Sequence, residues 1–300
     1  MEKTEFIWMD SKLILWDDAK IDVLTHTLHY GLGVFEGIRF YNINNKPAIF
    51  RLKEHVNRLF YGCENSNINI PFSKSEITNA IIELIKVNKI NSGYIRPLVY
   101  LGYGKMGLNP EGCIVNVAIA CWPWGSYLGD NPIKVKTSEF IRLHQKSTKT
   151  DLKICGHYVN SIFASMDIHK KGYDEALLLD FNENVAEGPG ENLFIAKDNI
   201  IYTPKLGTIL KGITRDSIIK IASDLKIKVI EKDIKLKEVY NADEAFFSGT
   251  AAEITAIKSL DDKNIGKTTQ GPITTKIKNL FLDTLKGKNN KYMEWLTIVE

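Results

Sequence analysis

The chain lacks the features that mark nucleic-acid, membrane and secreted proteins. Its 39 basic and 36 acidic side chains leave a net charge of +3, and no block of Lys or Arg is interleaved with aromatic residues, which disfavours nucleic-acid binding. No apolar run approaches the length of about 20 residues that a membrane helix needs, and the first residues lack the apolar core of a signal peptide. We therefore expect a cytoplasmic protein.

Cysteine is scarce and shows no ligand pattern. The four residues Cys63, Cys113, Cys121 and Cys155 have no CxxC spacing and no histidine partners in the order of a zinc site. They are typical of buried or free thiols in a reducing compartment, and we predict no metal site. A glycine-rich GxGxxG turn between a strand and a helix is also missing, which disfavours a Rossmann-type NAD enzyme.

The remaining composition is that of an ordinary globular protein. Three hundred residues, 44% hydrophobic and 25% charged, suffice for one large or two ordinary domains. The run from Trp122 to Pro132 is rich in proline, glycine and aromatic residues, which indicates an ordered connection between domains. The sequence thus predicts a small domain over 1–121, an inter-domain loop over 122–132 and a large domain over 133–300.

Periodicity predicts a mixture of helices and strands. In the first half, the patterns predict a strand over 13–16, a hairpin (38–40 and 48–50), helices from Leu52 and Ser73, and strands over 94–100 and 114–121. Ser73 with Glu76 three residues later has the pattern of a capping box. In the second half, they predict a helix over 158–170, helices after Gly212 and Gly271, and strands at 133–137, 176–180, 192–196, 200–203, 229–234 and 254–257. The fold class is α+β.

A candidate nucleophile stands in the stretch from Asp151 to Ser161. Lys153 lies between the apolar residues Leu152 and Ile154. An amine held among apolar side chains is partly desolvated, which disfavours its ammonium form and leaves it available as a nucleophile. In a lysine-rich chain, a solvated surface lysine is the alternative.

Two turns have the composition of an anion site. Gly212-Ile-Thr-Arg-Asp opens a helix, where free amides and the helix dipole favour an anion. Ser248-Gly-Thr-Ala follows a strand, and Gly249 allows successive amides to turn inward. Ordinary helix capping and an ordinary strand turn remain the alternatives.

A third stretch carries two carboxylates beside an apolar strand. In Ala186-Glu-Gly-Pro-Gly-Glu-Asn-Leu-Phe194, glycines around a proline form a rigid bend between Glu187 and Glu191. A loop that only joins two strands is one interpretation. The other is that a buried carboxylate here has a partner, such as a protonated ring nitrogen.

Together these segments resemble a known enzyme family. The resemblance covers the chain from about Trp8 to its last helix, in the family's order. It rests on Tyr30-Gly-Leu-Gly-Val-Phe-Glu-Gly-Ile-Arg39, Tyr94-Ile-Arg-Pro97, Lys153 with Gly156 and Tyr158, Glu187-Gly-Pro-Gly-Glu-Asn192, Gly212-Ile-Thr-Arg-Asp216 and Ser248-Gly-Thr-Ala-Ala-Glu-Ile-Thr255. The chain is similar to the branched-chain amino-acid aminotransferases, which are pyridoxal-phosphate enzymes of fold type IV. The resemblance implies a smaller N-terminal α/β sandwich-like domain and a larger C-terminal pseudo-barrel domain, with the cofactor in the cleft between them.

The resemblance also implies which residues hold pyridoxal 5'-phosphate. Lys153 would bind the cofactor covalently and carry the proton that moves during the reaction. Glu187 would pair with the pyridine nitrogen, and Tyr158 would hydrogen-bond the ring's phenolic oxygen. The phosphate would be bound by Arg58, Ile213, Thr214 and Thr250.

Substrate residues follow from the same resemblance. Tyr94 and the Thr250-Ala251 turn would take the α-carboxylate. Arg96 would take the distal carboxylate of glutamate, for which a bidentate pair offsets desolvation; an ion pair on the strand surface is the alternative. An apolar side-chain pocket would be lined by Phe35, Tyr127 and Tyr158, and from a neighbouring subunit by Tyr30 and the loop Met106-Gly-Leu-Asn.

The resulting hypothesis is a reversible transamination of L-leucine, L-isoleucine and L-valine with 2-oxoglutarate, in at least a homodimer. A D-amino-acid aminotransferase or an aminodeoxychorismate lyase of the same fold is the nearest alternative, and a phosphate-ligand binding protein without turnover is the next. Tyr94-Ile-Arg-Pro97 and Gly249-Thr-Ala-Ala-Glu253 favour the branched-chain group. Lys153 and Glu187 together argue against binding alone. The sequence does not rank the three substrates or decide among dimer, tetramer and hexamer.

Overall fold

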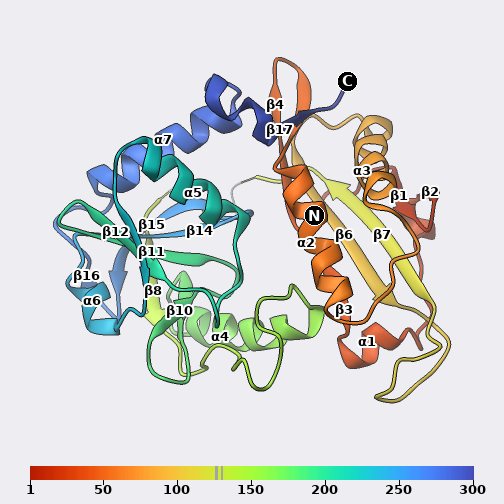
Figure 1. Cartoon of the computed structure of the whole chain (residues 1–300), viewed down its shortest axis with the longest axis horizontal. Coiled ribbons are helices and arrows are strands. Elements are labelled where there is room, and N and C mark those ends of the chain that lie inside the picture. Colours follow the sequence, from red (N-terminus) through yellow and green to blue (C-terminus); the bar gives the residue numbers. More distant parts are fainter. Residues whose placement is uncertain (126–127, 130) are drawn as a thin grey trace. The chain divides into compact units, whose positions relative to one another are not determined.

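The structure is a computed structural model that describes residues 1–125, 128–129 and 131–300. The chain divides into two compact units, drawn together in Figure 1. The first unit comprises Met1–Gly125, Leu152–Gly156 and Thr284–Glu300, and the second comprises Ser126–Asp151 and His157–Asp283. Each unit is built around its own sheet.

The first unit contains an antiparallel sheet with the strand order β17-β5-β4-β6-β7-β1-β2, in which β3 also pairs with β6. The strands are β1 (Phe6–Met9), β2 (Lys12–Leu15), β3 (Gly33–Phe35), β4 (Ile38–Ile43), β5 (Lys46–Phe50), β6 (Gly93–Leu101), β7 (Val115–Trp122) and β17 (Leu296–Ile298). The last strand joins the sheet because Leu296–Ile298 pairs with β5.

The core of the first unit lies between this sheet and the helices α2 (Leu52–Glu64) and α3 (Lys74–Asn88). Phe40, Ile95 and Ile119 from the strands pack with Leu59 and Ile81 from the helices. Helix α3 begins at the capping box expected from the sequence: the Ser73 side chain accepts from the Glu76 amide, and the Glu76 carboxylate accepts from the Ser73 amide. The short helix α1 (His26–Tyr30) precedes β3.

The second unit contains a sheet that closes on itself. Its strands run in the order β10-β9-β8-β15-β14-β11, and β10 also pairs with β11, which completes a ring. Strands β12 and β13 extend the sheet beyond β11, and β16 pairs with β15. The bounds are β8 (Ile133–Thr137), β9 (Glu175–Leu179), β10 (Val185–Glu187), β11 (Asn192–Lys197), β12 (Ile200–Pro204), β13 (Val229–Lys232), β14 (Glu244–Gly249), β15 (Glu253–Leu260) and β16 (Lys263–Asn264). The expected pseudo-barrel is confirmed.

Helices surround this ring (Figure 1). They are α4 (Tyr158–Lys170), α5 (Ile213–Asp224), α6 (Leu236–Tyr240) and α7 (Pro272–Leu285). Helix α4 packs on β9 through Ala164 and Ile168. The Glu244 carboxylate at the start of β14 accepts from the Ile273 and Thr274 amides at 2.9 and 2.7 Å, which caps α7. Over the part of the chain that the structure describes, no helix combines the length and apolar character needed to cross a bilayer.

Elements with a strong pattern match the predictions, and short ones do not. Helix α4 has the predicted bounds, whereas β1, α1, β3, β10, α6 and β17 were not predicted. Segments 152–156 and 284–300, expected in the large domain, group with the first unit. Segment 152–156 groups with the first unit because its main chain pairs with β3, where the Phe35 amide donates to the Lys153 carbonyl at 3.1 Å.

Candidate active site

The residues predicted to form the site belong to both units. The first unit holds Tyr30, Phe35, Arg58, Tyr94, Arg96 and Lys153, and the second holds Tyr158, Glu187, Ile213, Thr214, Thr250 and Ala251. Tyr127 lies outside the described residues.

Lys153 is held by its main chain against β3. Its carbonyl accepts from the Phe35 amide, and Ile154 forms a β-bridge with Val34. Leu152 is buried and Ile154 packs on the core of the first unit. The Lys153 Nζ atom lies 4.7 Å from the centroid of the Phe35 ring. The Lys153 side chain is half-buried, and its amine lies beside an aromatic face.

Arg96 lies among aromatic rings on β6. Its Cζ atom is 4.8 Å from the centroid of Phe35, 5.4 Å from that of Tyr94 and 6.0 Å from that of Trp122. The Nε atom is buried and has no hydrogen-bond partner in the described part of the chain. The same side chain borders a hollow of about 190 Å³, lined otherwise by Ile7, Met9, Ala19, Ile21, Leu98, Tyr100, Ala118 and Ala120. A partly buried guanidinium among aromatic rings is suited to bind a carboxylate.

Tyr94 is fixed beside Arg96 by close packing. The Trp122 and Trp124 rings each lie 5.3 Å from the Tyr94 ring, centroid to centroid. A Cβ atom at Gly37 would lie 1.8 Å from the Tyr94 hydroxyl oxygen, so that only glycine at position 37 allows this approach. The hydroxyl is thus placed by the loop between β3 and β4.

Arg58 is paired inside the first unit. Its Nε and Nη2 atoms donate to the two carboxylate oxygens of Glu36 at 2.6 and 2.9 Å, and His55 Nδ1 lies 2.7 Å from Glu36 Oε2. Burial by itself raises the pKa of Glu36, but the charge of Arg58 and the hydrogen bonds from Arg58 and His55 outweigh it and hold that pKa well below its usual range. Burial lowers the pKa of His55, so the imidazole is neutral near pH 7.

Tyr30 lies apart from this group, with its ring 42% exposed. Its hydroxyl accepts from the Gly107 amide at 3.2 Å, and the His26 ring lies 4.6 Å from its own. Tyr30 is therefore in contact with the loop that begins at Met106, the segment with which it was grouped in the sequence.

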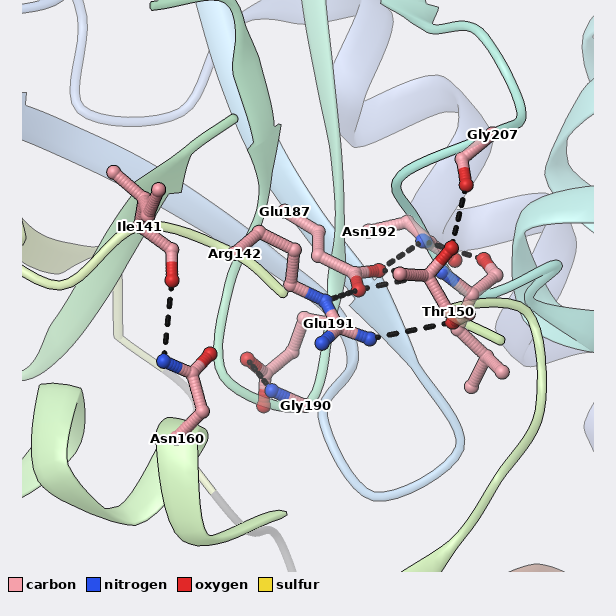
Figure 2. Close-up of polar contacts among 10 residues, drawn as sticks. Ile141, Arg142, Thr150, Asn160, Glu187, Gly190, Glu191, Asn192 and Gly207 are labelled. Atoms are coloured by element: carbon pink, nitrogen blue, oxygen red, sulfur yellow. Dashed lines mark hydrogen bonds and ion pairs between the residues drawn. The ribbon is translucent and has the colours of Figure 1, made fainter. Parts of the chain in front are cut away.

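In the second unit, Glu187 is the centre of a buried network (Figure 2). Arg142 Nε donates to Glu187 Oε1 at 2.6 Å, Asn192 Nδ2 donates to Oε2 at 3.0 Å, and the Leu210 amide donates to Oε2 at 3.1 Å. The Glu187 and Arg142 side chains are 7% and 9% exposed. These donors fix the orientation of the carboxylate.

The loop after Glu187 turns tightly. Glu187 and Asn192 are cross-strand neighbours, and the Gly188 amide donates to the Glu191 carbonyl at 2.7 Å. The Glu191 carboxylate accepts from the Gly190 amide at 3.1 Å. The two carboxylates that looked equivalent in the sequence thus differ: Glu187 faces the Arg142 network and Glu191 holds its own loop.

Two backbone turns meet this network. Gly212 precedes α5, and a Cβ atom there would lie 2.0 Å from Asn192 Oδ1. Gly212 is the N-cap residue of α5 and has no side chain with which to cap its first amides, those of Ile213 and the buried Thr214. At the other turn, a Cβ at Gly249 would lie 3.2 Å from the Gly190 carbonyl. The structure thus gathers Glu187, α5 and the β14–β15 turn.

The remaining predicted residues of this unit adjoin these elements. Tyr158 is the first residue of α4 and is half-buried. Thr250 and Ala251 form the half-buried turn between β14 and β15.

Comparison with known proteins shows the family of the chain. Residues 33–260 match the model of the amino-transferase class IV family. A Pseudomonas aeruginosa protein named branched-chain-amino-acid aminotransferase is 46% identical over 298 residues, which are 98% of this chain and 97% of that protein. The chain belongs to the branched-chain aminotransferases of class IV. The Escherichia coli K12 relative of the same name is 38% identical over 98% of this chain and 97% of its own.

Solved structures place this aminotransferase in the same group. A T.th. branched-chain amino acid aminotransferase, complexed with N-(5'-phosphopyridoxyl)-L-glutamate, is 42% identical with a TM-score of 0.97, and both chains are covered completely. The Escherichia coli enzyme is 38% identical with a TM-score of 0.97, over 99% of this chain and all of that one. The predicted family, enzyme class and type IV fold are confirmed.

The residues present fit a pyridoxal-phosphate cofactor. Glu187 offers an oriented carboxylate to a protonated ring nitrogen. The first amides of α5 offer donors to a phosphate. Lys153 offers an amine beside an aromatic face.

The sequence analysis missed the side chains that hold this site in place. Arg142 has no motif of its own, because its partner Glu187 is 45 residues away. Glu36 was quoted only as part of a motif, and His55 was not singled out. The one available signal was spacing, since His55 and Arg58 are three apart on a helix and so share a face.

Proposed function

We propose that this protein transfers the α-amino group of L-leucine, L-isoleucine and L-valine reversibly to 2-oxoglutarate, and so forms branched-chain 2-oxo acids and L-glutamate. The observation that carries the proposal is the Glu187 carboxylate, which three donors hold in one plane inside the second unit. One structure of the T.th. enzyme is a complex with 4-methylvaleric acid, a branched acid, and another is a complex with a phosphopyridoxyl adduct of glutamate. Those ligands correspond to the two substrate classes.

The proposed cofactor is pyridoxal 5'-phosphate, whose ring withdraws electrons from the substrate α-carbon when it is bound. Lys153 would hold the cofactor covalently through its Nζ atom, with water as the leaving group, and its amine, once freed, would take up the proton that leaves the α-carbon. Glu187 holds a proton on the ring nitrogen, since a buried carboxylate stabilises the cation it faces. The Tyr158 hydroxyl donates to the ring's phenolic oxygen.

The phosphate of the cofactor is assigned to separate groups of donors. Arg58 contributes a guanidinium, whose fork geometry suits phosphate. The Ile213 and Thr214 amides donate hydrogen bonds from the positive N-terminal end of α5. Thr250 binds from the turn after β14. Gly212 supports this assignment because it lets the start of α5 pack against Asn192, where a Cβ atom would lie 2.0 Å from Asn192 Oδ1.

Substrate recognition is assigned to the aromatic group around Arg96. Tyr94, Thr250 and Ala251 bind the α-carboxylate, while Phe35 and Tyr127 line the side-chain pocket together with Tyr158. Arg96 binds the distal carboxylate of glutamate. The contact of its guanidinium with Phe35, Tyr94 and Trp122 supports this role. The same rings offer an apolar surface to a branched side chain, so one pocket serves both substrates.

We propose at least a homodimer, in which Tyr30 and the Met106 loop complete the neighbouring subunit's pocket. Tyr30, Met106 and Leu108 are 42, 41 and 89% exposed in the single chain, which supports a covering partner. We also propose a reducing, cytoplasmic setting, because Cys63, Cys113, Cys121 and Cys155 are all free thiols.

The test is the visible absorption spectrum of the purified protein, recorded before and after addition of L-leucine and, in parallel, of D-alanine. A yellow cofactor band that only L-leucine converts supports the proposal. If D-alanine alone converts the band, the substrate assignment is wrong and a D-amino-acid aminotransferase is the better description.

Two lysine variants test whether Lys153, and not a nearby lysine, is the point of cofactor attachment. Lys153→Ala abolishes the L-leucine-dependent change, whereas Lys149→Ala, four residues earlier in the chain, leaves it intact. Loss of the change in both variants, or in neither, would contradict the assignment of Lys153.

A further inference from the structure

Glu36 is a fully buried carboxylate that holds two basic side chains of one helix. Its side chain is 1% exposed. Oε1 accepts from Arg58 Nε at 2.6 Å, Oε2 accepts from Arg58 Nη2 at 2.9 Å, and His55 Nδ1 lies 2.7 Å from Oε2. The pair occupies two of the five N–H donors of the guanidinium. Glu36 therefore binds one edge of the Arg58 guanidinium and fixes the orientation of the guanidinium plane.

The carboxylate itself is anchored by the main chain. Glu36 stands between β3 and β4, and its amide donates to the Pro97 carbonyl of β6 at 2.9 Å. The Gly37 amide donates to Glu36 Oε2 at 3.2 Å. Because Glu36 is hydrogen-bonded to the sheet, its ion pair with Arg58 fixes that side chain of α2 relative to the sheet.

His55 stabilises the same carboxylate from a second direction. With its Nδ1–H directed to Glu36, the buried Nε2 carries a lone pair and has no hydrogen-bond partner within the described residues. An unpaired acceptor costs less than an unpaired, buried N–H of a charged ring. The neutral imidazole adds a donor to Glu36 without adding charge beside Arg58.

Stability alone does not explain this arrangement. A buried ion pair is weak evidence for stabilisation, because desolvation of both charges offsets their attraction, and apolar side chains of similar size often serve as well. A fixed partner also holds a long, flexible arginine side chain in a single orientation before a ligand binds.

We propose that Glu36 and His55 are positioning residues that orient the Arg58 guanidinium and thereby set the affinity of the protein for the phosphate group of its cofactor. The inference rests on the proposed function, in which Arg58 binds that phosphate. Neither residue touches the phosphate itself; both act through Arg58.

The experiment compares two ligands that differ only in the phosphate. Apoprotein is titrated with pyridoxal 5'-phosphate and with pyridoxal, and the dissociation constants are read from absorption. We expect Glu36→Gln to raise the dissociation constant for pyridoxal phosphate about tenfold or more, because one charge-assisted contact to the guanidinium is lost. The dissociation constant for pyridoxal should change by no more than about twofold. We expect His55→Gln to act in the same direction and less strongly.

Glu54→Gln is the matched control. Glu54 also pairs with an arginine of the same helix region, since Arg51 Nε lies 2.8 Å from Glu54 Oε1. Neither ligand should bind this variant differently. If Glu36→Gln weakens both ligands equally, or neither, Glu36 does not act through phosphate recognition and the inference is wrong.

Arg58→Met distinguishes this failure from failure of the proposed function. If the wild type does not prefer pyridoxal phosphate over pyridoxal, or if Arg58→Met keeps the preference, the phosphate role of Arg58 is refuted and the inference with it. If Arg58→Met loses the preference while Glu36→Gln keeps it, only the positioning role is refuted. Glu36→Asp, which retains the charge but draws the carboxylate back, should also reduce the preference and replaces Glu36→Gln should that variant not fold.

Discussion

Replacement of Arg142 by methionine tests the buried pair at the centre of the second unit. Arg142 Nε lies 2.6 Å from Glu187 Oε1, and the side chains are 9% and 7% exposed, so water screens the pair little. In the variant the carboxylate keeps Asn192 and the Leu210 amide as donors. Removal of one partner of a buried pair costs about 3 to 5 kcal/mol. Because two donors remain, we expect a loss of about 3 kcal/mol in the free energy of unfolding of the apoprotein.

The assay is urea unfolding of the apoprotein followed by far-ultraviolet circular dichroism. A loss of about 3 kcal/mol lowers the transition midpoint by about 1 M or more at ordinary denaturant slopes. Lys220→Met is the control, because Lys220 pairs with Asp216 at 2.8 Å on an exposed turn of α5. Such a surface pair contributes about 0.5 kcal/mol at most, so the midpoint should barely move.

A second variant separates lost charge from lost packing. Arg142→Met combined with Glu187→Gln removes the uncompensated charge and should recover much of the stability lost in Arg142→Met. If Arg142→Met unfolds at the wild-type midpoint, Arg142 does not stabilise the Glu187 carboxylate and the reasoning is refuted. If the double variant is less stable than Arg142→Met, the loss arises from packing.

Three further predictions concern acid sensitivity, a glycine and a helix cap. Burial raises the pKa of Glu36, but the charge of Arg58 and the hydrogen bonds from Arg58 and His55 outweigh it and lower that pKa below the usual 4.5, while burial lowers the pKa of His55 below the usual 6.5. Both groups bind protons more readily in the unfolded chain, so the apoprotein melting temperature should fall as pH drops below 6.5 and again below 4.5, and a flat profile would contradict this. Gly212→Ala places a Cβ 2.0 Å from Asn192 Oδ1 and should cost about 1 to 3 kcal/mol and weaken pyridoxal-phosphate binding, measured by urea unfolding and titration. Ser73→Ala removes the cap of α3 and should cost about 1 kcal/mol in urea unfolding, with cofactor affinity unchanged.

Matched variants accompany the last two predictions. Gly190→Ala places its Cβ with no described heavy atom within 4 Å, so stability should change far less than in Gly212→Ala. Ser75→Ala alters a neighbouring exposed serine inside α3 and leaves the cap intact. Equal losses within either pair would show that the close approach or the cap is not the cause.

The elements that could be predicted are those whose signals are local. The capping box at Ser73 and the pattern over 158–170 define helices through contacts only three or four residues apart. The strands β3 and β10 have three residues each, too few for a recognisable period. They exist because neighbouring strands supply their hydrogen-bond partners, as β6 does for β3.

By itself the sequence determined the family, the α+β class and the motifs around Lys153 and Glu187, because those signals lie within short runs of chain. Only the tertiary structure decided which partners surround them. The ion pair of Glu36 with Arg58 joins residues 22 positions apart in the sequence, and the ion pair of Arg142 with Glu187 joins residues 45 positions apart. Such pairs leave no local pattern, since ionic attraction and burial depend on distance in the folded chain and not on separation along it.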